Sequence, residues 1–249
     1  MNSIGSGDAA LLLVGGLVAG VVNTLAGGGS LLTVPLLVLV GLPGTLANGT
    51  NRIGVLLQNA AAIWSFRRSG VSGIRESVPV LVPVVTGSLI GAFAISRVDD
   101  ATFQRVFGVV MLLLLWPTLR GSIVRRRRPA RPWPRLVSSA AFLAIGLYGG
   151  AIQAGVGLLL VLALSQAGSD LVRASSIKVV VVGCLTAAAV PVFLAAGQIA
   201  WLPAALLATG QSLGGALGAR LAVRGGERLI RPALAAAVVG LAGRMLGLY

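Results

Sequence analysis

The sequence predicts an all-α membrane protein built from two related halves, and two observations predict it. The first is composition. Hydrophobic residues make up 56% of the 249 residues and charged residues only 10%, with a mean hydropathy of +0.95, whereas a soluble domain has about 25% charged residues. The second is an internal repeat, in which residues 41–70 are related to residues 168–197.

The repeat is recognised by residues that match at a spacing of 127 positions, and by the hexapeptide GSLIGA, which recurs as QSLGGA at 211–216. A repeat of this length in an apolar chain is typical of a transporter whose site lies where its halves meet. The matched pairs are Gly41 with Gly168, Ala47 with Ala174, Phe66 with Phe193, and Gly70 with Gly197.

Each half contains five apolar segments, and the second segment of each is too short to cross a membrane. A crossing needs about 20 residues. Glycine-rich breaks precede both short segments: NTLAGGGS at 23–30 and QAGVG at 153–157. The first and second segments of each half therefore form a pair, which is either one discontinuous helix or a helical hairpin. The segments are 9–25, 31–40, 53–66, 78–95 and 103–119, then 136–152, 158–164, 177–195, 200–221 and 230–246.

The placement of basic residues favours the hairpin. If each pair made one net crossing, the halves would be parallel and the basic residues would divide 11 against 7 between the two sides. If each pair returns to its own side, the division is 15 against 3, with Arg52 and Lys178 set aside as intramembrane. The positive-inside rule favours the second arrangement. It makes the halves inverted repeats, with both termini outside the cytoplasm.

A basic linker divides the chain. We expect a first transmembrane repeat at 1–119, a cytoplasmic linker at 120–135 and a second repeat at 136–249. The linker holds seven arginines and much of the net charge of +14. Because it joins apolar repeats, its charge indicates contact with anionic lipid and not with nucleic acid. Residues 1–7 carry no lysine or arginine, which argues that the first apolar segment is kept and not cleaved.

The two breaks are the predicted site. Each glycine in a helix interior costs about 1 kcal/mol relative to alanine, and the first break has three in a row. The break is either a flexible kink or an unwound segment that faces a cavity. In the second interpretation, the half-helix that begins near Ser30 and the one after QAGVG point positive N-termini into the membrane and together attract an anion.

Arg52 and Lys178 support an anion site. They lie 126 residues apart, at nearly equivalent points at the start of long apolar segments. They either attract the anion or extend to the membrane surface. Gln58, Asn59 and Gln153 are weaker candidates, because a buried amide can simply join two helices. The predicted substrate-binding residues are Asn23, Gly28, Gly29, Ser30, Thr50, Asn51 and Arg52 in the first half, with Gln153, Gly155, Gly157, Ser175, Ser176 and Lys178 in the second.

The absence of certain residue types and motifs limits the reactions and ligands that we expect. There is no histidine, and all six acids fall in predicted loops, so we expect no side chain that carries a proton within the membrane. The sequence has no phosphate-binding loop. It also has no cluster of metal-ligating or catalytic side chains, so we expect no cofactor, no metal and no enzyme activity. The acids are Asp8, Glu76, Asp99, Asp100, Asp170 and Glu227.

Two motifs resemble a known family. The run GLVAGVVNTLAGGGSLLTVPLLVLVGLPGTLANGTN, followed by a basic residue, is similar to the first repeat of the TauE/SafE family, the sulfite exporter or sulfonate permease group. GLYGGAIQAGVGLLL and RASSIK resemble its second repeat, without the triple glycine. The likeness covers nearly the whole chain. It implies transport of sulfite, sulfoacetate, thiosulfate or other organosulfur anions across the bacterial cytoplasmic membrane.

We therefore expect a multi-pass transporter of small anions, most simply an exporter of sulfur oxyanions or organosulfonates. Its partners would be the anionic substrate and the bilayer, and a homodimer is left open. Two alternatives also remain: a membrane enzyme or assembly factor that uses the same cavity, and a cation or metal permease.

Overall fold

The computed structural model describes residues 4–119, 134–166 and 171–225, and within these ranges the chain forms helices and no strands. The tenth predicted segment and nearly all of the basic linker lie outside the described residues. The helices are α1 (Ser6–Ala26), α2 (Ser30–Leu39), α3 (Gly44–Arg68), α4 (Ile74–Ile95), α5 (Asp100–Leu119), α6 (Arg135–Ala151), α7 (Val156–Gln166), α8 (Leu171–Ala195) and α9 (Trp201–Val223).

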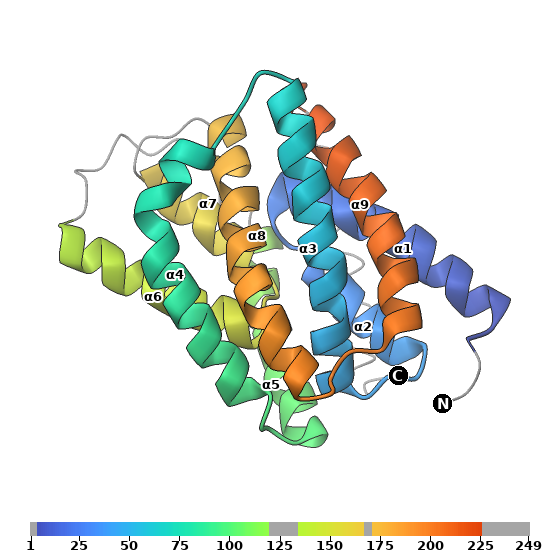
Figure 1. The fold of residues 1–249 in the computed structure, drawn as a ribbon. Coiled ribbons are helices and arrows are strands. Elements are labelled where there is room, and N and C mark those ends of the chain that lie inside the picture. The colour runs from blue at the N-terminus through green and yellow to red at the C-terminus, as the bar shows by residue number, and fades with distance from the viewer. Residues whose placement is uncertain (1–3, 120–133, 167–170, 226–249) are drawn as a thin grey trace.

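The two halves exchange their outer helices (Figure 1). Helix α1 of the first half packs along α9 of the second, and α6 of the second half packs along α4 of the first. Between these pairs, α3 and α8 lie against each other at the centre. They run antiparallel, because Thr50 near the start of α3 bonds to Ala200 after the end of α8, whereas Asn59 lies beside Gly183 in mid-helix.

The short helices return the chain to the end from which it came. Helices α1 and α3 both run parallel to α9, and α6 and α8 both run parallel to α4, as their successive close contacts show. Helix α2 therefore runs back towards the beginning of α1, and α7 towards the beginning of α6 (Figure 1). These directions suit the predicted hairpins and inverted repeats, whose placement in a membrane stays a prediction.

Glycine allows the backbones of the exchanged helices to approach closely, α4 against α6 and α1 against α9. A Cβ added at Gly91 of α4 would lie 2.0 Å from the carbonyl oxygen of Leu147, and one added at Gly214 of α9 would lie 2.1 Å from that of Leu17. Larger residues would separate the backbones. Small residues at helix interfaces are what brings membrane helices into contact, because lipid supplies no hydrophobic driving force.

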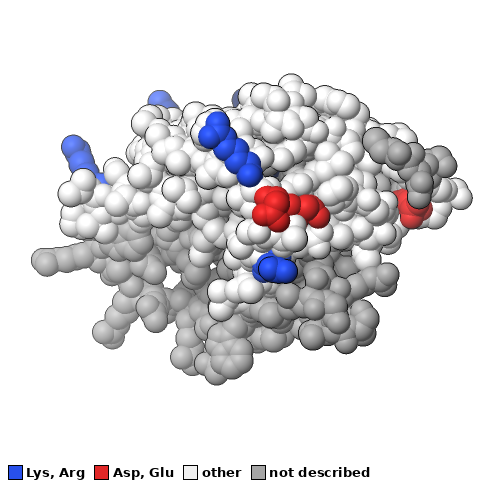
Figure 2. Space-filling model, turned by 90° about the horizontal axis from the view of Figure 1, so that it is seen from below, with Lys and Arg blue, Asp and Glu red and all other residues white. Residues whose placement is uncertain are grey.

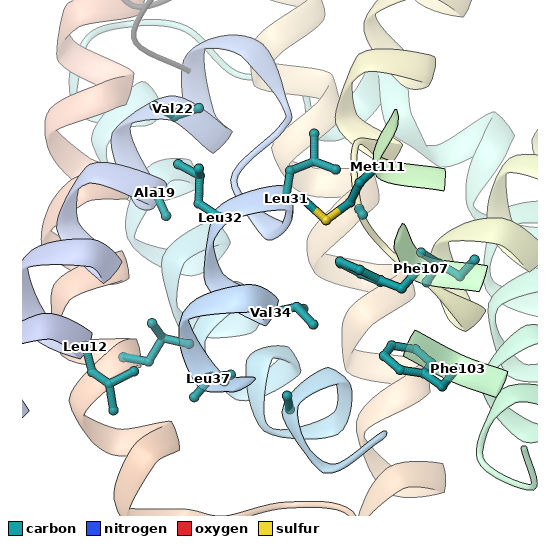
Figure 3. Close-up of a cluster of buried hydrophobic side chains, with 14 residues drawn as sticks. Leu12, Ala19, Val22, Leu31, Leu32, Val34, Leu37, Phe103, Phe107 and Met111 are labelled. Carbon is teal, nitrogen blue, oxygen red and sulfur yellow. The ribbon is translucent and has the colours of Figure 1, made fainter. Parts of the chain in front are cut away.

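The apolar residues form both a core and an outer surface. One core cluster joins α1, α2 and α5 (Figure 3), where Phe103 and Phe107 have ring centroids 5.5 Å apart. Large apolar side chains also face outward, including Val82 at 76% exposed and Leu113 at 69%. Three described helices, Ser6–Leu25, Ile74–Ile95 and Val172–Ala195, are long and apolar enough to cross a membrane. The predicted all-α membrane architecture is confirmed.

Three of the four described acids lie in the first turns of helices and not in loops, which corrects the sequence expectation for them, whereas Asp99 lies in the loop before α5 as expected. Asp8, Glu76 and Asp100 are in the first turns of α1, α4 and α5, and Asp99 accepts a hydrogen bond from the amide of Thr102. An acid is stabilised there by the positive end of the helix. Asp170 and Glu227 lie outside the described residues.

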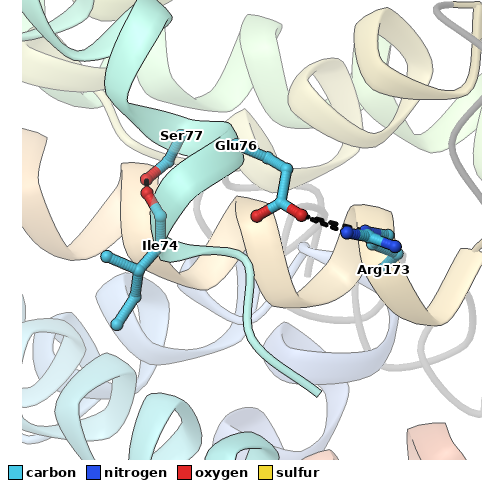
Figure 4. A network of polar contacts seen from close by, with 4 residues as sticks. All are labelled: Ile74, Glu76, Ser77 and Arg173. Atoms are coloured by element: carbon cyan, nitrogen blue, oxygen red, sulfur yellow. Dashed lines mark hydrogen bonds and ion pairs between the residues drawn. The ribbon is translucent and has the colours of Figure 1, made fainter.

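Most of the described arginines lie at one end of the bundle. The ends of α3 and α9 and the beginnings of α4, α6 and α8 meet there, and Arg173 pairs with Glu76 across two of them (Figure 4). The opposite end has Arg97 and Arg105. Seen from below, most of the described surface is uncharged (Figure 2). The arginines of the first end are Arg67, Arg68, Arg75, Arg135, Arg173, Arg220 and Arg224.

Candidate functional site

The two helix breaks meet at the interface between the halves. The first follows α1, where Gly27 has φ 82°, and the second follows α6, where Gln153 has φ 62° and Gly155 has φ 70°. A Cβ added at Gly27 would lie 2.4 Å from the carbonyl carbon of Gly157. The backbones of the two breaks are therefore in direct contact, and the closeness requires glycine.

Arg52 lies beside the second break. Helix α3 begins at Gly44, two turns earlier than expected, so Arg52 is within the helix and is fully buried. Its guanidinium donates to the carbonyl oxygens of Gly149, Gly150 and Ala151, at 2.7, 2.6 and 3.1 Å. These carbonyls form the last turn of α6. The side chain does not extend to the surface, and it lies 4.8 Å from the ring centre of Phe193.

Lys178 makes the reciprocal contact at the first break. Helix α8 also begins earlier than expected, at Leu171, and Lys178 is 2% exposed. Its ammonium donates to the carbonyl oxygens of Asn23 and Thr24, at 2.9 and 2.6 Å. These carbonyls lie in the last turn of α1. Each buried base therefore caps the broken helix of the opposite half.

Side-chain amides hold the first break in shape. Asn23 donates to Gln58 at 3.0 Å and accepts a bond from the amide of Gly29 at 3.2 Å. Gln58 in turn donates to the hydroxyl of Thr24 at 3.3 Å. The network links the end of α1, the glycine break and the middle of α3, which favours the interpretation of the break as an ordered unwound segment; that interpretation stays a prediction.

Asn51 supports the beginning of α2. Its amide nitrogen donates to Ser30 at 3.3 Å, while its oxygen accepts bonds from Thr33 at 2.6 Å and from Gln211 at 3.4 Å. All four side chains are buried. Thr50, which we also expected at the break, is instead turned towards α9, where its hydroxyl accepts a bond from the amide of Ala200 at 2.9 Å.

The second break is held by fewer side chains. Gln153 donates to Thr186 at 2.6 Å, and Thr186 donates to the carbonyl of Val182 at 2.6 Å. The hydroxyl of Tyr148 bonds to the carbonyl of Ala154. Ser175 and Ser176 are buried in α8, and the backbone of Ser176 packs against Gly73.

Several buried polar atoms near the breaks are left without a hydrogen-bond partner. Within the described part of the chain these include Nε of Arg52, Oε1 of Gln153 and Oε1 of Gln211. Buried polar groups are normally hydrogen bonded. These atoms therefore have hydrogen-bonding capacity to spare: Nε of Arg52 as a donor, and the two glutamine oxygens as acceptors.

Sequence reasoning missed Thr33, Thr186 and Gln211 as members of these networks. Gln211 interrupts the apolar stretch of α9, and an isolated amide within such a stretch is the signal that could have indicated it. No group of three or more metal-ligating side chains occurs among the residues described.

The sequence is similar to known membrane proteins over most of its length. The model of the family described as "Sulfite exporter TauE/SafE" matches residues 12–245. A probable membrane transporter protein of Haemophilus influenzae is 30% identical over 90% of this chain and 88% of its own length. The probable membrane transporter protein ORF9 of a Sinorhizobium species is 26% identical over 95% and 92%.

The probable membrane transporter protein YfcA of Escherichia coli K12 is 24% identical over 92% of this chain and 86% of its own length. No solved structure matches significantly. The family match covers almost the whole chain, and the relatives are named as transporters and not as enzymes. The chain therefore belongs to the TauE/SafE family of membrane transporters.

Proposed function

We propose that the chain exports small anions, chiefly sulfur oxyanions or organosulfonates, and that the substrate passes where the two breaks meet. The observation that carries the proposal is Arg52, a fully buried base at that meeting point. Within the described part of the chain, its partners are three carbonyl oxygens and an aromatic ring. All of them are formally neutral, so these contacts hold the side chain in place but leave its formal positive charge.

The helix ends add to this charge. A helix has a partial positive charge at its N-terminus and a partial negative charge at its C-terminus. Arg52 and Lys178 cover the negative ends of α6 and α1. The positive ends of α2 and α7, which begin at Ser30 and Val156, then favour an anion. An anion also suits the hydroxyl and amide donors of Ser30, Asn51 and Gln211.

The family description and the membrane potential support the substrate class and direction. The matching family is described as a sulfite exporter. A negative interior drives an anion outward by about 2.3 kcal/mol per charge for each 100 mV. We place the chain in the bacterial cytoplasmic membrane, with the linker in the cytoplasm and both termini outside it. Apart from Thr50, whose hydroxyl is turned towards Ala200, the predicted substrate-binding residues remain the proposed lining of the path.

Flux into proteoliposomes tests the proposal. Vesicles that hold the purified chain should take up sulfite or sulfoacetate and should not take up a divalent cation. Arg52→Gln keeps hydrogen-bond donors but removes the charge, so it should reduce anion flux about tenfold or more. Arg97→Gln, at the end of the bundle, is the matched control and should keep its flux. Cation uptake without anion uptake would indicate the permease alternative.

A further inference from the structure

We propose that Arg52 and Lys178 are tethered cations, which occupy the two positions where a transporter with broken helices would otherwise bind a coupling ion. The inference rests on the proposed function, because it describes how that path works without a second ion. Both residues are positioning residues: Arg52 holds the last turn of α6 and Lys178 the last turn of α1, beside the path.

The argument begins with the carbonyl groups at a helix end. The last four carbonyls of a helix have no partner within it, and they carry the negative end of the helix dipole. In transporters with discontinuous helices, such carbonyls coordinate sodium ions or protons. Here the ammonium of Lys178 lies 2.9 and 2.6 Å from two carbonyls of α1. A side chain therefore fills the position of an ion at this helix end.

The second helix end is filled in the same way but with different geometry. The guanidinium of Arg52 contacts three consecutive carbonyls of α6. A guanidinium presents a planar fork of donors, whereas an ammonium is a compact point charge. The two ends should therefore select different cations, the first an ammonium and the second a guanidinium.

The hydrogen bonds of both side chains cross from one half to the other. Arg52 belongs to α3 and reaches α6, while Lys178 belongs to α8 and reaches α1. A freely diffusing ion would bind and leave in each transport cycle, but a tethered cation remains. Flux through the native chain should therefore need no sodium or potassium gradient, and removing either side chain should create a requirement for an added cation.

Chemical rescue tests the inference. Arg52→Ala and Lys178→Ala should each lower anion flux about 10- to 100-fold, because hydrogen bonds to charged groups are lost. Guanidinium in the millimolar range should restore Arg52→Ala several-fold, and methylammonium should restore Lys178→Ala. Neither cation should rescue the other variant or change the native chain. Lys178→Arg should keep more flux than Lys178→Ala, and Arg97→Ala should behave as the native chain.

Thermal unfolding in detergent separates this inference from the proposed function. If the native chain moves no anion, the proposed function fails, yet the matched cation should still raise the unfolding temperature of its own variant and not of the other. Rescue by both cations alike, or by neither, in both flux and unfolding would overturn the inference. A strict sodium requirement in the native chain would overturn it as well.

Discussion

Asn51 and Arg52 are neighbours in the chain, yet they support different halves of the molecule. Consecutive residues of a helix point in directions about 100° apart. Asn51 reaches Ser30 and Thr33 of its own half, whereas Arg52 reaches the last turn of α6. One turn of α3 therefore holds both the beginning of α2 and the end of α6.

Gln58 should contribute measurably to stability. Gln58→Leu conserves volume but removes the bonds to Asn23 and Thr24. We expect the free energy of unfolding to fall by about 0.6 to 1.7 kcal/mol, from the average to the largest value for a hydrogen bond between membrane helices. Thr209→Val removes only an exposed bond within α9 and is the control. Equal stability of both variants, measured by unfolding in detergent, would show that the amide network does not hold the break.

At the scale of elements, the two breaks were the most predictable feature, because short apolar segments after clustered glycines can hardly form a full crossing. The beginnings of α3 and α8 were harder. Hydropathy placed them at residues 53 and 177, whereas the helices begin at Gly44 and Leu171. The polar residues at these points find partners in other helices: Asn51 bonds to α2 of its own half, whereas Arg52 and Lys178 bond to helices of the opposite half. Such partners are not visible from a local pattern.

The contact between the breaks should not tolerate a methyl group. Gly27→Ala would place its Cβ 2.4 Å from the carbonyl carbon of Gly157, and it would strain a left-handed residue by about 1 to 2 kcal/mol. Gly41→Ala has the same strain at φ 91° but nothing within 4 Å. We expect Gly27→Ala to lose anion flux and Gly41→Ala to lose only some stability. Equal flux in both variants would remove the contact from the mechanism.

At the scale of the whole molecule, the halves are interlocked by exchanged helices and by the two crossed bases. The sequence repeat predicted that two halves exist, and the positive-inside rule predicted that the short helices return. Neither the repeat nor the charge pattern could predict that Arg52 and Lys178 cap helices of the opposite half. These contacts depend on packing between residues about 100 positions apart or more. The sequence favours a role for both in attracting the anion, and their carbonyl contacts add a positioning role.

Cysteine labelling should establish the orientation. In a Cys184→Ala background, Ser69→Cys and Arg224→Cys lie at the arginine-rich end, and Ala196→Cys lies at the other. All three positions are exposed. In intact cells an impermeant maleimide should label only Ala196→Cys, because basic ends remain in the cytoplasm. Labelling of either Ser69→Cys or Arg224→Cys, but not both, would refute the inverted arrangement.

Anion efflux under a controlled membrane potential tests the central claim most directly. Liposomes that hold the purified chain are loaded with sulfite, and potassium with valinomycin sets the potential at equal pH and without sodium. If the crossed bases make a path that carries the anion alone, efflux accelerates as the interior is made negative, by about 2.3 kcal/mol of driving force per charge for each 100 mV. Efflux that ignores the potential and responds only to a pH or sodium gradient would contradict the account.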